Sequence, residues 1–172
     1  DVKVEVEGEY DANGVLVVKK IEFKSEANLE MKAMVDAVDT AAKTVTVLGD
    51  KIIHVNNETM MVDDSSDQVR YFDLADLVAG TDWVEIRAYE DANGDLVATK
   101  LERDDGSASD PAVMEGDLSA DLSAGTALEV SGVAISYPSS YTAPTLAAGS
   151  EVKVSWTYNA GTLTFGSVQL DN

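Results

Sequence analysis

The sequence predicts an all-β protein built from small barrels, and three observations support this prediction. One hairpin motif occurs three times along the 172 residues. Apolar and polar residues alternate before each of its turns, which is typical of strands with one buried face. Between the hairpins, further short strands recur in the same order. The 45% hydrophobic content supplies enough apolar surface for a core.

The first two copies of the motif are VEVEGEYDANGVLVVKKIEF, residues 4–23, and VEIRAYEDANGDLVATKLER, residues 84–103. Ten of their twenty positions are identical at a constant offset of 80. A third copy, VKVSWTYNAGTLTFGSVQL at residues 152–170, lacks one residue in the turn. In DANG, the Asp side chain can bond back to the turn and the Gly accepts a positive φ. We therefore expect a hairpin turn here rather than a calcium loop, since the Gly and Glu spacing of an EF-hand is missing.

The second strand of each copy shows the same break in its alternation. Leu16 and Val18 are followed by Ile21 and Phe23 rather than by apolar residues at 20 and 22. The other two copies change phase at the same place. One extra residue at a fixed position predicts a β-bulge, which bends a strand and helps small barrels to close.

The segments between the hairpins complete a repeating unit. Residues 45–59 (VTVLGDKIIHVNNET) correspond to residues 128–142 (LEVSGVAISYPSSYT), and each reads as two short strands. A further strand precedes each pair, at residues 31–39 and 112–120. FDLADLVAG, residues 72–80, predicts a short helix with Asp73 as its N-cap, whereas its counterpart at 143–149 predicts little or no helix. Three strands, a helix or loop, and two strands is the order of a five-stranded OB-type barrel.

These same residues resemble a known bacterial family, the domain of unknown function numbered 5666. The similarity rests on VTVLG, on FxLADLxxG, and on VEI followed by DANGDLVATKLE. It is clear over residues 31–103 and loose over 112–171, and residues 1–23 are similar to the last two strands of a further copy. The resemblance implies a small β-barrel found in exported proteins, often with several repeats. It implies no catalytic or binding residues.

The expected organisation is therefore two tandem five-stranded OB-like barrels preceded by an extra β-hairpin. Residues 1–30 form the hairpin and a connector, and residues 31–103 form the first barrel. The acidic stretch 104–111 is a linker, because it combines charge, Gly, Ser and Pro without an apolar period. Residues 112–172 form a diverged second barrel.

Charge and composition exclude several classes of function. With 32 acidic and 12 basic side chains, the net charge is −20, and so acidic a surface repels phosphate backbones, which makes nucleic acid an unsuitable partner. The acidity fits solubility, a salty medium or cation binding. No cysteine is present, which removes disulfides and thiolate sites. No apolar run approaches the length of a membrane span.

The sequence offers two kinds of candidate ligand site. The cluster of Asp63, Asp64 and Asp67 could gather carboxylates around calcium, as could Asp104, Asp105 and Asp110 in the linker. The rings of Tyr137, Tyr141 and Trp156 could form a contact surface for carbohydrate or protein. In the alternative interpretation, Trp156 and Phe165 fill a core.

We expect no enzyme. His54 is the single histidine, so one chain cannot form a Ser-His-Asp triad, and no carboxylate pair stands out for glycoside hydrolysis. The sequence instead favours an exported, extracellular or cell-surface structural protein that acts through protein contacts, with the periplasm as a further location. The alternative is an extracellular binding module for calcium or carbohydrate.

The N-terminal hairpin is the feature with the most functional content. Two strands alone are marginal in water, yet residues 1–23 show the pattern of a pair that packs against something. We expect Val2, Val4, Val6, Ile21 and Phe23 to form the contact. The hairpin could pack on its own chain, belong to a longer repeat array, or dock on a neighbour and build a head-to-tail fibre.

Overall fold

The computed structural model is all-β, and it describes residues 4–11, 13–23, 27–123, 125–159 and 161–171. The side chains of residues 4–7 and 20–23 lie outside this description. The elements are β1 (Val4–Tyr10), β2 (Leu16–Phe23), β3 (Leu29–Asp39), β4 (Thr44–Val47), β5 (Lys51–His54), β6 (Met60–Asp63), η1 (Leu74–Asp76), β7 (Trp83–Glu90), β8 (Leu96–Asp104), β9 (Ala112–Asp117), β10 (Ala127–Val130), β11 (Val133–Ser136), β12 (Glu151–Asn159) and β13 (Thr162–Leu170).

Five of these strands close a barrel, which confirms the expected architecture for residues 31–103. Strand β3 pairs with β4 through its C-terminal half and with β7 through its N-terminal half, and β4 pairs with β5. The hairpin β7–β8 returns the chain to β5, where Ile53 lies opposite Leu96 in a parallel pairing. The barrel interior holds fully buried side chains such as Val35, Val45 and Ile86. Strand β6, which was not foreseen, runs parallel to the end of β8.

The short helix and the turns follow from local chemistry. Asp73 caps η1 by accepting a hydrogen bond from the backbone N–H of Ala75, and Asp76 accepts one from the backbone N–H of Asp73. Such a capping box satisfies backbone donors that the helix leaves open. As expected, the described residues of 143–149 contain no helix.

The DANG segments are hairpin turns, as the sequence indicates. The Asp91 carboxylate accepts hydrogen bonds from the backbone N–H of Asn93, at 2.8 Å, and of Asp95, at 3.0 Å. Asp11 makes the same pair of bonds in the first copy. These backbone donors hold the pKa of both aspartates below its usual range. Gly94 has φ of 87°, a conformation that glycine adopts without strain.

The predicted bulge is present in all three hairpins. The register shifts between Glu7 and Gly8, between Arg87 and Ala88, and between Ser155 and Trp156. The unpaired residue on the second strand is Lys19, Thr99 or Gly166, respectively.

The second unit extends the sheet of the first instead of forming a separate barrel. Strand β9 pairs with β3, placing Met114 opposite Met31, and continues to β12 and β13. Strands β10 and β11 form their own two-stranded sheet, joined to the rest by a bridge between Leu118 and Val130. Among the described residues, β11 and β13 do not pair. The tandem arrangement of two closed barrels is therefore not confirmed.

The second unit differs from the first in one cross-strand pair. Ala88 lies opposite Ala98 in the closed barrel, and both are almost completely buried. Aligning the motif copies puts Trp156 and Phe165 at these positions, again opposite each other, with ring centroids 6.2 Å apart. Two aromatic side chains need far more room than two methyl groups. In the first unit, strands close over this space. In the second unit, aromatic rings fill it, which is the physical reason why the second unit stays open.

The two units share one core. The indole of Trp83 meets the ring of Tyr158 edge-on at 5.7 Å, and the Ser131 hydroxyl donates to the Asn28 carbonyl at 2.6 Å. The connecting stretch 104–111 is held against the barrel, since Asp105 accepts a hydrogen bond from the Ser66 backbone. Its residue Asp104 is the end of β8.

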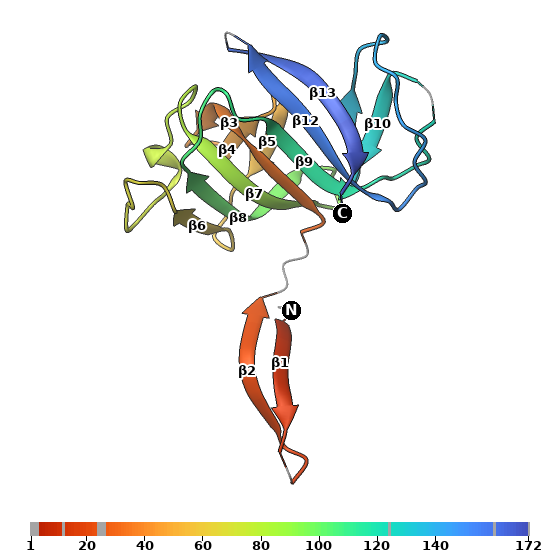
Figure 1. Cartoon of the computed structure of the whole chain (residues 1–172). Coiled ribbons are helices and arrows are strands. Elements are labelled where there is room, and N and C mark those ends of the chain that lie inside the picture. Colours follow the sequence, from red (N-terminus) through yellow and green to blue (C-terminus); the bar gives the residue numbers. More distant parts are fainter. Residues whose placement is uncertain (1–3, 12, 24–26, 124, 160, 172) are drawn as a thin grey trace.

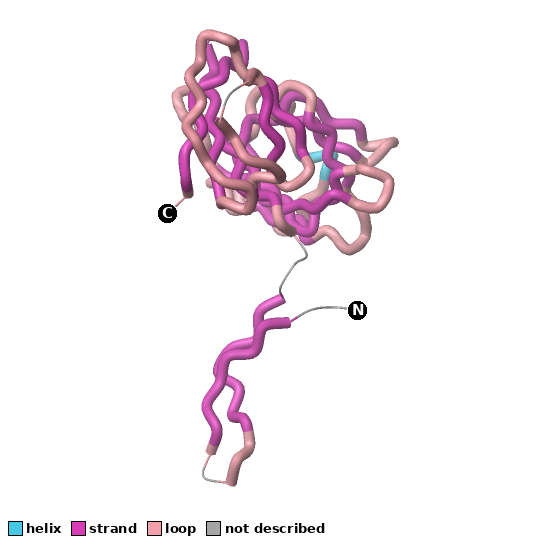
Figure 2. The backbone as a smooth tube through the Cα atoms, turned by 90° about the vertical axis from the view of Figure 1, so that its right-hand side faces the viewer, coloured by secondary structure: helices cyan, strands magenta, loops and turns pink. Residues whose placement is uncertain are grey.

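The hairpin β1–β2 stands apart from this body. It forms a two-stranded sheet of its own, and Figures 1 and 2 show it projecting away from the barrel side on which β3 begins. Within the described part of the chain, no helix has the length and apolar character needed to cross a bilayer.

Candidate functional site

The hairpin presents apolar side chains to solvent on both of its faces. Val17 is 53% exposed, and Leu16 and Val18 are 39% and 44% exposed. The corresponding residues of β8, Leu96 and Ala98, are 8% and 2% exposed because the barrel covers them. We call the exposed set the hairpin surface; it consists of Tyr10, Val15, Leu16, Val17 and Val18.

Both outer edges of the hairpin are also free in the described part of the chain, since β1 and β2 pair with each other alone. The equivalent hairpin β7–β8 uses both of its outer edges. There, β7 binds β3 in antiparallel fashion, and β8 binds β5 and β6 in parallel. Unpaired backbone groups on an edge strand are a template for another strand. The hairpin therefore has the surface and the edges of a barrel component without a barrel around it.

The contact residues expected from sequence are brought together in part. Val4 pairs with Phe23 and Val6 pairs with Ile21 across the hairpin. The side chains of these four residues, and all of Val2, lie outside the described part of the structure. The exposed Leu16, Val17 and Val18 further along β2 were not in the expected set, although they belong to an uninterrupted apolar run, VLVV at residues 15–18.

The acidic cluster around Asp63 is organised by an arginine. Asp63 accepts hydrogen bonds from Arg103 at two points, Nε to Oδ1 at 2.9 Å and Nη2 to Oδ2 at 2.6 Å. The same carboxylate accepts from the Ser65 hydroxyl at 2.6 Å and from the Val69 backbone N–H at 2.6 Å. The Asp63 side chain is 0% exposed. Both carboxylate oxygens of Asp63 thus already accept hydrogen bonds from the protein.

The electrostatics of this cluster follow from the same contacts. The Arg103 guanidinium holds the pKa of Asp63 well below its usual range, against the opposing effect of burial, and the bonds from Ser65 and Val69 lower it further. Asp63 in turn raises the pKa of Arg103. Asp67 and Asp82 lie 3.7 Å and 3.6 Å from the guanidinium, so the positive charge is shared among three acids.

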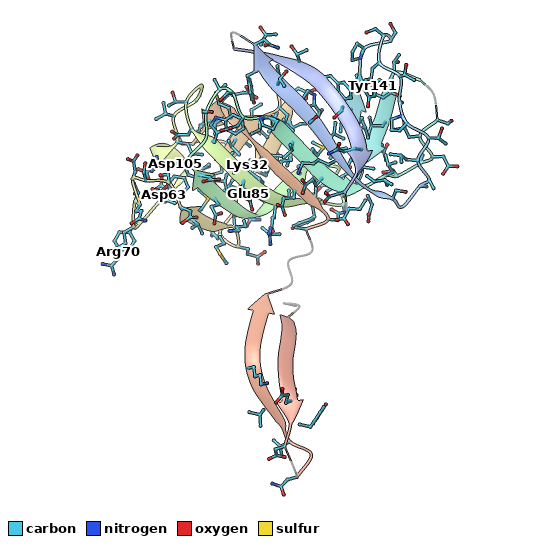
Figure 3. The ribbon with its side chains drawn as sticks, in the orientation of Figure 1. Lys32, Asp63, Arg70, Glu85, Asp105 and Tyr141 are labelled. Atoms are coloured by element: carbon cyan, nitrogen blue, oxygen red, sulfur yellow. The ribbon has the colours of Figure 1, made fainter. Side chains whose placement is uncertain are left out.

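Beside Arg103 lies an open pocket of about 170 Å³. Its lining includes Asp67, Asp82, Asp105 and Gly106; Figure 3 labels Asp63 and Asp105 in this part of the barrel. The described residues contain no group of three or more potential ligands arranged to hold a metal ion. Asp63 and Asp67 are among the acids around the buried Arg103, whereas Asp64 contacts it through its backbone N–H, which donates to the Arg103 carbonyl. A calcium site at Asp63, Asp64 and Asp67 stays a prediction.

Sequence reasoning missed Arg103, but a signal was present. In the aligned motif copies, the position of Arg103 is Phe23 in the first hairpin and Leu170 in the third. A basic residue at an otherwise apolar position indicates a buried ion pair, since an isolated buried charge is too costly. The ring of Phe72, 5.1 Å from the guanidinium carbon, completes its surroundings.

Several aromatic residues of the second unit contact one another around Phe165 of β13. Tyr137 and Trp156 are buried, at 4% and 7% exposure, which fits the interpretation that these rings belong to a core. The Tyr137 and Phe165 rings lie 5.5 Å apart, and Tyr141 packs edge-on against Phe165 at 4.9 Å. Tyr137 directly follows β11 and Phe165 lies on β13, so ring contacts join the two strands whose equivalents, β5 and β8, pair directly in the first barrel.

Tyr141 also bonds the edge of β13 directly. Its hydroxyl accepts a hydrogen bond from the Val168 backbone N–H at 2.9 Å and donates to the Val168 carbonyl at 3.4 Å. At Val168, the Tyr141 side chain thus makes the hydrogen bonds that a neighbouring strand would otherwise make. We call the region bounded by β11 and β13, and filled by Tyr137, Tyr141 and Phe165, the seam.

Comparison with known proteins identifies the closed barrel. Residues 32–102 match the family model described as a domain of unknown function, DUF5666, which confirms the resemblance noted in the sequence. The matched segment runs from β3 into β8 and so coincides with the closed five-stranded barrel. No curated protein matches the chain, and no solved structure matches it.

Proposed function

We propose that this chain is a non-enzymatic structural protein, exported to the cell surface or the extracellular space, that self-associates through its N-terminal hairpin. The observation that carries the proposal is the difference in burial between equivalent strands. Leu96 in β8 is 8% exposed and Leu16 in β2 is 39% exposed, although the two hairpins share their turn and their bulge. The first hairpin has the composition of a packed element and lacks the packing.

The energetics favour a partner for this hairpin. A two-stranded hairpin is at best marginally stable in water, whereas added strands or a packed face stabilise it. Burying side chains such as Leu16, Val17 and Val18 in a contact contributes roughly 25 cal/mol per Å² of apolar area. A hairpin with two free edges can gain backbone hydrogen bonds in the same step.

The charge of the molecule sets the conditions for this contact. A net charge of −20 makes two copies repel each other. Salt screens such repulsion, with a Debye length of about 8 Å at physiological ionic strength. Self-association through an apolar hairpin should therefore strengthen as the salt concentration rises. This dependence agrees with a function in an extracellular medium.

The test replaces a residue of the hairpin alone. Val17→Pro should disrupt β2, because proline has no N–H to donate and does not fit a strand interior. Val17→Thr keeps a β-branched residue and serves as the matched control. In sedimentation velocity over a range of protein and salt concentrations, wild type and Val17→Thr should form species larger than a monomer, whereas Val17→Pro should stay monomeric with an unchanged barrel melting temperature. A wild-type chain that is monomeric at every concentration contradicts the proposal.

A separate measurement tests the location. Fractionation of the source cells, followed by antibody detection, should place the protein outside the cytoplasm. Detection in the cytoplasmic fraction alone would remove export from the proposal.

A further inference from the structure

The seam of the second unit has the properties of a receiving site for the hairpin. We propose that the hairpin β1–β2 of one copy inserts into the seam of a second copy, with β2 beside β11 and β1 beside β13. This inference rests on the proposed function and adds the identity of the partner surface. It predicts a head-to-tail contact, because the donating and receiving surfaces differ and each copy carries both.

Strand directions in the first barrel show why the hairpin fits. There β8 lies parallel to β5, and β7 lies antiparallel to β3. Aligning the repeats equates β2 with β8, β1 with β7 and β11 with β5. Strand β9 is antiparallel to β12 and, at the bridge between Leu118 and Val130, to β10, so β13 and β11 both follow the direction of β9. An inserted hairpin then places β2 parallel to β11 and β1 antiparallel to β13. Strand β2 then has a parallel neighbour, as its equivalent β8 does, and β1 has an antiparallel neighbour, as its equivalent β7 does.

The chemistry of the two edges supports the same conclusion. Strands β11 (VAIS) and β13 (TLTFGSVQL) carry no charged residue, in a chain with 26% charged residues. Charged residues are one means by which proteins protect an exposed edge strand, and neither edge has them, although β13 carries the bulge at Gly166. Strand β1 (VEVEGEY) is acidic, so a receiving edge without carboxylates avoids like-charge repulsion on docking.

The Tyr141 hydroxyl marks the point at which the seam must open. It occupies both the N–H and the carbonyl of Val168, the backbone groups that an added strand would use. Figure 3 places Tyr141 in the second unit, far from the hairpin of its own chain. The tyrosine protects the edge of a free copy and competes with an incoming strand.

The first experiment places a charge on the seam. Thr164 and Thr157 are an exposed cross-strand pair, with Thr164 on the edge strand β13 and Thr157 on β12. Thr164→Glu should lower self-association by at least tenfold, because a carboxylate on β13 repels the acidic strand β1 that would dock beside it. Thr157→Glu makes the same change in net charge one strand further in and should associate like wild type. Equal behaviour of the two variants overturns the seam proposal, and the loss of association in Val17→Pro would still support the hairpin.

A mixing experiment tests the head-to-tail geometry. Val17→Pro has an intact seam and a broken hairpin, whereas Thr164→Glu has an intact hairpin and a blocked seam. Each alone should remain monomeric, and their mixture should form a 1:1 dimer and nothing larger, as measured by multi-angle light scattering. A mixture that stays monomeric, or that forms longer species, overturns the proposal.

Removing the competing hydroxyl gives an independent readout. Tyr141→Phe keeps the ring contacts with Tyr137 and Phe165 and frees Val168. One hydrogen bond is worth about 1 kcal/mol net, so self-association should tighten by roughly fivefold. A Tyr141→Phe chain that associates no more tightly than wild type contradicts a seam that opens at this residue.

Discussion

Arg103 at the end of β8 and Asp63 at the end of β6 form a two-point ion pair, with both side chains almost completely withdrawn from solvent. The pair joins the two strands where they run parallel, with Asp63 and Arg103 directly opposite each other. A paired arrangement of this kind satisfies both charges, and it adds the geometric specificity of a planar guanidinium. The barrel therefore depends locally on a contact that neither residue can make alone.

Replacing Arg103 with leucine should destabilise the barrel strongly. Leu170 holds the corresponding place in β13, so the side chain is compatible with a strand. The change leaves the Asp63 carboxylate buried without its cation, a defect that costs about 3–5 kcal/mol in unfolding free energy. Urea unfolding measures the loss. The double variant Asp63→Asn, Arg103→Leu should recover part of it, and a double variant as unstable as the sum of the two single variants would contradict the coupling.

The same pair predicts a loss of stability in acid. Because the folded-state pKa of Asp63 lies below the unfolded value of about 3.9, its contribution is complete above that pH. The contribution is lost as the pH falls toward the folded-state pKa, because the unfolded chain takes up the proton first. Asp63→Asn should flatten the fall in the urea midpoint between pH 5 and about pH 3. Asp64→Asn, which removes a neighbouring carboxylate and keeps the pair, should follow the wild-type curve.

Gly106 holds the connecting stretch against Trp83, and an added methyl group should dislodge it. A Cβ atom at Gly106 would lie 2.3 Å from Cγ of the Trp83 indole. Gly106→Ala should cost about 1–3 kcal/mol, as overpacking does elsewhere, and should shift tryptophan emission to longer wavelength. In a Trp83→Phe background, the same change should cost less, because the smaller ring leaves room for the methyl group. An equal cost in both backgrounds would show that the contact does not matter.

The local features of this fold could be predicted from sequence because short-range chemistry fixes them. The Asp11 and Asp91 turns, the Asp73 cap and the position of the bulge all depend on residues within a few positions of one another. The closed barrel followed from the order of its strands and from a family resemblance that the comparison confirmed.

The features that escaped prediction depend on contacts between distant segments. The parallel pairing of β6 with β8 joins residues about forty positions apart, as Asp63 and Arg103 show. The pairing of β3 with β9, with Met31 opposite Met114, turns two units into one sheet and cannot be read from either strand alone. The openness of the second unit depends on how the Trp156 and Phe165 rings fit between strands, which is a matter of volume in three dimensions.

The common bulge has a consequence for how such hairpins are reused. Its position is the same at Lys19, Thr99 and Gly166, although one hairpin completes a barrel, one lies at a sheet edge and one stands free. The curvature is therefore a property of the hairpin and not of its surroundings. A hairpin whose curvature is set by its own sequence keeps its shape beside different neighbouring strands. The same short segment could therefore be exchanged between barrels during evolution or in design.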